Sequence, residues 1–89
     1  MKMDAVLQEL ERAAQSLAVK VQYDVLTESV GGGGLCKVKG AYRVIIERRG
    51  TPAEKAVTLA RALAGVPGME GVELGPDARD LVEKNRRAA

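Results

Sequence analysis

The chain has 89 residues, enough for one small domain, and 46% of them are hydrophobic. It contains two Tyr but no Phe, Trp or His, so the core must be aliphatic, and histidine-dependent catalysis and histidine-ligated zinc are excluded. The single cysteine, Cys36, can form neither an internal disulfide nor a cysteine-rich metal site. A net charge of +2 is too small to indicate nucleic acid or an anionic membrane as a partner. Acids at positions 4, 9 and 11 interrupt any secretory signal, and no apolar stretch approaches the roughly 20 residues of a membrane span, so we expect a cytoplasmic protein.

The first predicted element is an amphipathic helix with Asp4 as its N-cap and an apolar stripe at Leu7, Leu10, Ala14 and Leu17. A strand with one buried face follows, because apolar and polar side chains then alternate over residues 19–25. The run Gly31 to Gly34 predicts a flexible link, because four successive glycines lose too much backbone entropy inside an element. It is not a phosphate-binding loop, since Leu35-Cys36 follows it where a Lys and a Ser or Thr are required.

Residues 35–38 and 42–48 predict a β-hairpin closed by Lys39-Gly40-Ala41. If Val38 faces Tyr42, one face is almost wholly apolar, and its members are Cys36, Val38, Tyr42, Val44 and Ile46. The opposite face then carries Leu35, Lys37, Arg43, Ile45 and Glu47. In this register Cys36 is a small core residue. A nucleophilic Cys36 is the alternative, but no His is present to activate it.

The clearest local signal is Thr51-Pro52-Ala53-Glu54, a capping box that begins a helix ending near Gly65. A short extended piece at residues 72–74 precedes a last helix that opens at Pro76. The predicted order is therefore α-β-β-β-α-(β)-α. We expect a single α+β domain over residues 1–89, with a three-stranded antiparallel sheet and its helices packed on one face.

The stretch from Gly34 to Gly65, with its strand Tyr42-Arg43-Val44-Ile45-Ile46 and the later Thr58-Leu59-Ala60, resembles the ImmA/IrrE family of small zinc metallopeptidases. In that family a hairpin precedes a helix carrying Leu-Ala-His-Glu-x-x-His. The resemblance places Arg61 at the first zinc-binding His, Ala62 at the general-base Glu and Gly65 at the second His. None of the three can perform that role, so the resemblance implies a degenerate, metal-free relative. The segments Leu35-Cys36 and Lys39-Gly40 are also similar to short uncharacterised bacterial proteins, a resemblance that implies no activity.

The sequence therefore predicts no catalytic, cofactor-binding or metal-binding residues. We expect a non-catalytic interaction or regulatory module that forms a homodimer or binds a protein partner. Its candidate interaction residues lie on the predicted helix-free face of the sheet, and they are Leu35, Lys37, Arg43 and Ile45. The alternative is a nucleic-acid accessory domain that uses the cations of the hairpin around residues 37–49. An enzyme that works through Cys36, and a plain soluble domain without a distinct site, stay open.

Overall fold

The computed structural model describes residues 2–25 and 33–88. The helices and strands are, in order, α1 (Met3–Ser16), β1 (Lys20–Asp24), β2 (Gly33–Val38), β3 (Ala41–Glu47), α2 (Pro52–Leu63), a short 3-10 turn (Met69–Gly71) and α3 (Pro76–Ala88). The α+β class and the order of the three helices and three strands are confirmed. No strand forms at residues 72–74, where an optional one was predicted, because that segment pairs with no strand in the described part of the chain.

The sheet is mixed, not antiparallel as predicted. Its strand order is β1-β3-β2, with β1 parallel and β2 antiparallel to the central strand β3. A period-2 pattern of apolar residues identifies a strand but carries no information about its direction. Residues 25–32 also separate β1 from β2 by enough chain to reach either side of β3, which lies only about 5 Å from each neighbour.

The hairpin closes one residue tighter than predicted, which changes the face on which each β2 side chain lies. Val38 pairs with Ala41 and Leu35 with Val44, so the loop is the dipeptide Lys39-Gly40 alone. Both loop residues have positive φ, 51° and 81°, as a type I′ turn requires. This turn matches the right-handed twist of the two strands, which favours it over the predicted three-residue loop. The predicted register is therefore wrong.

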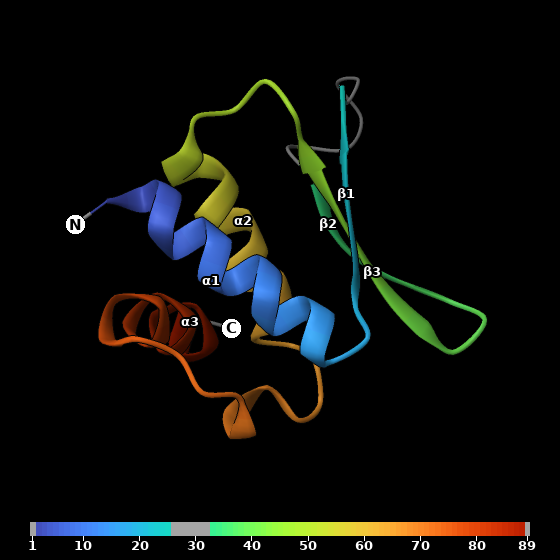
Figure 1. Cartoon of the computed structure of the whole chain (residues 1–89). Coiled ribbons are helices and arrows are strands. Elements are labelled where there is room, and N and C mark those ends of the chain that lie inside the picture. The colour runs from blue at the N-terminus through green and yellow to red at the C-terminus, as the bar shows by residue number, and fades with distance from the viewer. Residues whose placement is uncertain (1, 26–32, 89) are drawn as a thin grey trace.

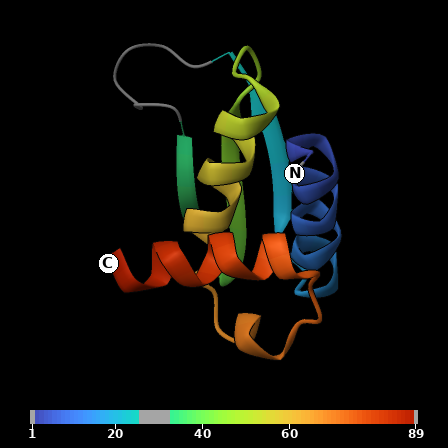
Figure 2. The same ribbon diagram turned by 90° about the vertical axis from the view of Figure 1, so that its left-hand side faces the viewer.

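Two helices cover one face of the sheet, and the third packs on those two (Figure 1). α1 and α2 lie side by side, with α1 against β1 and α2 against β2 and β3. α3 crosses α2 in the view of Figure 2 and contacts α1 and α2. The core between these layers is aliphatic, and its largest fully buried side chains are Leu10, Val44, Ile46, Leu59, Leu63, Met69 and Val82.

The ends of the helices, and the glycine run before β2, show which of the predicted local signals determine where an element begins. The capping box of α2 forms as predicted: Thr51 Oγ1 accepts from the Glu54 amide at 3.1 Å, and Glu54 Oε1 accepts from the Thr51 amide at 2.8 Å. In contrast, α1 begins at Met3, so Asp4 lies in its first turn and is not the N-cap. Gly33 and Gly34 belong to β2 rather than to a flexible link, and Gly31 and Gly32 lie outside the described residues.

Candidate functional site

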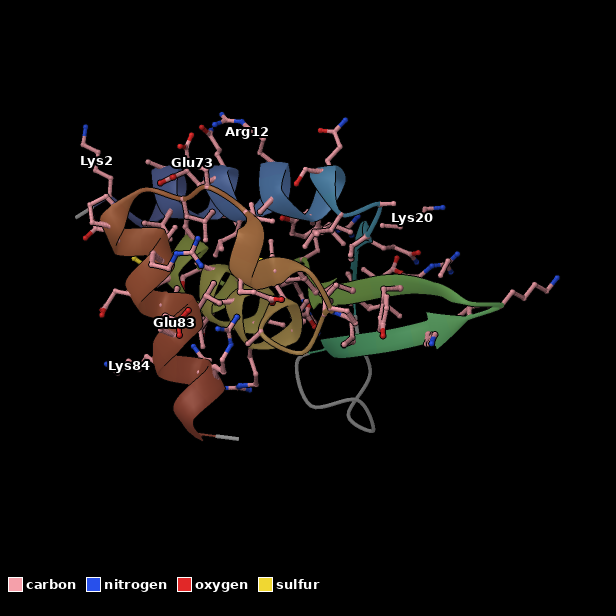
Figure 3. The ribbon with its side chains drawn as sticks, turned by 90° about the horizontal axis from the view of Figure 1, so that it is seen from below. Lys2, Arg12, Lys20, Glu73, Glu83 and Lys84 are labelled. Carbon is pink, nitrogen blue, oxygen red and sulfur yellow. The ribbon has the colours of Figure 1, made fainter. Side chains whose placement is uncertain are left out.

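The face of the sheet opposite the helices is the main candidate surface, and we call it the open face. Its members follow from two rules: residues paired across strands share a face, and successive residues of one strand point to opposite faces. They are Lys20, Gln22 and Asp24 on β1, Gly34, Cys36 and Val38 on β2, and Ala41, Arg43, Ile45 and Glu47 on β3. None of the described helices packs on this face, and Figure 3 shows Lys20 extending away from the helices.

The four predicted interaction residues are divided between the two faces. Arg43 and Ile45 lie on the open face, but Leu35 and Lys37 lie on the helix side, paired with Val44 and Tyr42. Leu35 is still 36% exposed because it belongs to the edge strand. Its side chain lies close to Gly65, just after α2, where a Cβ added to the glycine would be 3.7 Å from Leu35 Cδ2. The Lys37 ammonium lies 5.3 Å from the centroid of the Tyr42 ring, a cation–π distance.

Sequence reasoning missed the β2 members of the open face because it placed that strand in the wrong register. Cys36, predicted as a core residue, is exposed, and Val38 is 47% exposed beside the turn. The signal that could have located them is the dipeptide Lys39-Gly40, since glycine suits the second position of a type I′ turn. The three β1 members were predicted as the polar side of that strand, but not as neighbours of Arg43 and Ile45.

The hairpin cations do not form one patch. Lys37 lies on the helix side, Arg43 lies on the open face, and Lys39 occupies the turn. Arg49, at the other end of β3, is held by Glu47, with Nη2 2.8 Å from Oε1 and Nε 3.1 Å from Oε2. Both tyrosines pack on the helix side against the core, so neither offers a stacking platform beside Arg43.

Two hollows outside the sheet face include polar side chains that already have structural contacts. One of about 230 Å³ lies by the start of α2, where Glu54 belongs to the capping box, Thr58 Oγ1 donates to the Glu54 carbonyl at 3.0 Å and Lys55 covers the Tyr23 ring at 5.5 Å. The other, of about 510 Å³, lies between α1 and the segment before α3, where Glu9 Oε1 accepts from the Gly75 amide at 2.7 Å. These polar groups therefore hold the fold together.

The positions at which the ImmA/IrrE resemblance would place zinc ligands do not fit a metal. Arg61 and Ala62 line a hollow of about 160 Å³ beside β2, together with Gly34, Leu35 and Thr58. Arg61 is permanently cationic, Ala62 has no donor atom, and Gly65 has no side chain. Among the described residues, no group of three or more His, Cys, Asp or Glu side chains gathers where a metal could bind.

One polar cluster ties α1, β1 and α2 together. The Tyr23 hydroxyl on β1 donates a hydrogen bond to Glu11 on α1, and Lys55 on α2 lies over the tyrosine ring. Partial burial, with the hydrogen bond and the negative charge of Glu11, raises the pKa of the Tyr23 hydroxyl above its ordinary range. A phenol that stays protonated and donates to a carboxylate is a structural contact.

Comparison with known proteins adds no relative: no family model matches the sequence, and neither a curated protein nor a solved structure is detectably similar. Within residues 2–25 and 33–88, none of the helices has the length and apolar character needed to cross a bilayer.

Proposed function

We propose that the chain is a non-catalytic interaction module that self-associates through the open face of its sheet. The observation that carries the proposal is the composition of this face. Ile45 pairs with Gly34 on β2, and the exposed Cys36 and Val38 lie one and two rows further along the same face, on a side of the sheet that none of the described helices covers. A three-stranded sheet with an uncovered, partly apolar face gains stability when a second surface packs on it.

The open face is a better supported route than the free edge of β2. Lys37 on that strand and Lys39 directly after it place positive charge along the edge. Lysine on an edge strand disfavours pairing with a strand of another chain, which is how many proteins protect exposed edges.

The non-catalytic part of the proposal rests on the chemistry of the side chains. Around the hollows, Glu54, Thr58 and Lys55 serve capping, helix and cation–π contacts, and the chain has no histidine to act as a base or ligand. Arg61, Ala62 and Gly65 support the same conclusion, because the resemblance to zinc peptidases extends over a helix whose functional positions hold residues that cannot bind zinc.

The test is the oligomeric state of Ile45→Lys, measured by sedimentation velocity over a wide range of protein concentration. The wild type should show a concentration-dependent dimer, and the variant should weaken it about 100-fold, because two lysines would meet at the centre of the interface. Val25→Lys is the matched control, since Val25 is 47% exposed but lies outside the open face. A wild type that stays monomeric at millimolar concentration, unchanged by Ile45→Lys, would refute the proposal.

A further inference from the structure

The open face has its charges separated along the strands. The register places Lys20 beside Arg43 at the end nearer the hairpin turn, and Asp24 beside Glu47 at the other end. Ile45 lies between these two rows, with Gln22 on one side and Gly34 on the other. Adjacent rows are two residues apart along a strand, so each charged row lies about 6.6 Å from Ile45 and about 13 Å from the other charged row.

The local contacts keep the charges of both rows at the surface. Neither Lys20 nor Arg43 forms an ion pair with another of the described residues. Asp24 accepts a hydrogen bond from the Gln22 side-chain amide, and Glu47 binds Arg49 through both of its carboxylate oxygens, so the acidic charge relevant to a contact is that of Asp24. A Cβ built at Gly34 would meet nothing within 4 Å, so the surface beside Ile45 leaves room for a close approach.

We propose that two copies pack open face to open face about a two-fold axis that runs across the strands at Ile45, so that Lys20 of each copy meets Asp24 of the other. This inference rests on the proposed function and names its partner, which is a second copy of the chain. Such an axis reverses the direction of the strands and therefore exchanges the cationic row with the acidic row.

The charge pattern selects this axis over its alternative. An axis along the strands would preserve the rows and set Arg43 against Arg43, a juxtaposition of like charges that disfavours the complex. Both axes bring the two Ile45 side chains together, so the apolar centre does not distinguish them. The orientation therefore depends on the charged rows, and the contact is isologous, as a closed dimer requires.

The size of the face sets the strength of the contact. Three strands about 4.8 Å apart and about 17 Å long present roughly 250 Å² in projection, well below the roughly 800 Å² per partner of a standard stable interface. We therefore expect a weak dimer with a dissociation constant in the micromolar range or above, which forms and separates with protein concentration.

A charge exchange on β1 tests the orientation. Lys20→Asp and Asp24→Lys should each weaken the dimer about tenfold at low salt, because each replaces two symmetry-related attractions by repulsions. The double variant Lys20→Asp/Asp24→Lys has the net charge of the wild type and should dimerise within about threefold of it, because the exchanged charges again meet opposite charges. Thermal melts of all variants check that the monomer fold is retained.

The outcomes separate this inference from the proposed function. If Lys20→Asp dimerises as tightly as the wild type or more tightly, or if the double variant is no better than the single ones, the orientation is wrong. The open face then still mediates the contact if Ile45→Lys weakens self-association. If Ile45→Lys has no effect on self-association either, the open face is not the interface and both proposals fail.

Discussion

The type I′ turn at Lys39-Gly40 determines which β2 side chains reach the open face, and the variant Gly40→Ala tests it directly. Gly40 has φ +81°, and a Cβ built there meets nothing within 4 Å, so any cost of the substitution comes from the backbone conformation and not from a clash. An L-residue held in the left-handed region costs about 1–2 kcal/mol relative to its preferred conformations. Alanine also lowers the conformational entropy of the unfolded chain, which increases the free energy of unfolding by about 0.4–1 kcal/mol.

Gly71→Ala is the matched control for this experiment. A Cβ at Gly71 also meets nothing within 4 Å, but the φ of this residue is not positive. The unfolded-state gain is therefore common to both variants and cancels in the comparison. Gly40→Ala should be less stable than Gly71→Ala by about 1–2 kcal/mol, the cost of the left-handed conformation alone.

Thermal unfolding followed by circular dichroism measures this difference. For a domain of this size, 1 kcal/mol corresponds to about 4–8 °C, so the two variants should differ in Tm by roughly 5–15 °C. Urea titrations give the same comparison as free energies and show through the m-value whether the unfolded state has changed. Equal Tm values for the two variants would contradict the positive φ at Gly40, and with it the two-residue loop and the assignment of Cys36 to the open face.

Two further predictions follow from the exposed thiol and from the tyrosine cluster. Cys36 is exposed, so in dilute native protein it should react with a thiol reagent as fast as in the unfolded chain. A thiol that reacts only after unfolding would show that Cys36 lies on the helix side of the sheet. Because the pKa of the Tyr23 hydroxyl is raised, its stabilising contribution is complete below the ordinary pKa of 10.0 and is lost as the pH rises beyond it. Tyr23→Phe should therefore cost about 1 kcal/mol at neutral pH and should reduce the loss of stability between pH 9 and pH 11, measured by urea unfolding. An alkaline loss equal to that of the wild type would show that Tyr23 does not titrate with folding.

The sequence predicted well where a signal is local. Thr51 and Glu54 are three residues apart, and each satisfies a backbone amide of the other, so the start of α2 needs no tertiary information. Helical spacing also accounts for Ala78 and Val82, buried residues of α3 that lie four positions apart on one face. Interactions within one or two helical turns determine where these features form.

The prediction from sequence failed where the register and direction of a strand depend on its pairing partner. The β2 segment reads as a strand in either register, and a shift of one residue moves Leu35 to the helix side and Cys36 to the open face. The direction of β1 relative to β3 has no local signal at all. Consequently Ile45 and Arg43 were identified correctly as open-face residues, but their neighbours Lys20 and Asp24 became visible only once the parallel pairing was known.

The parallel pairing of β1 with β3 also has a consequence for biosynthesis. β1 neighbours only β3 in the sheet, and Lys20, its first paired residue, pairs with Arg43, which is synthesised 23 residues later. At translation rates of roughly 5–20 residues per second, that interval lasts on the order of one to five seconds. During it, Val21 and Tyr23 have no strand to pair with, and α1, which contacts β1 in the folded protein, is the helix already synthesised.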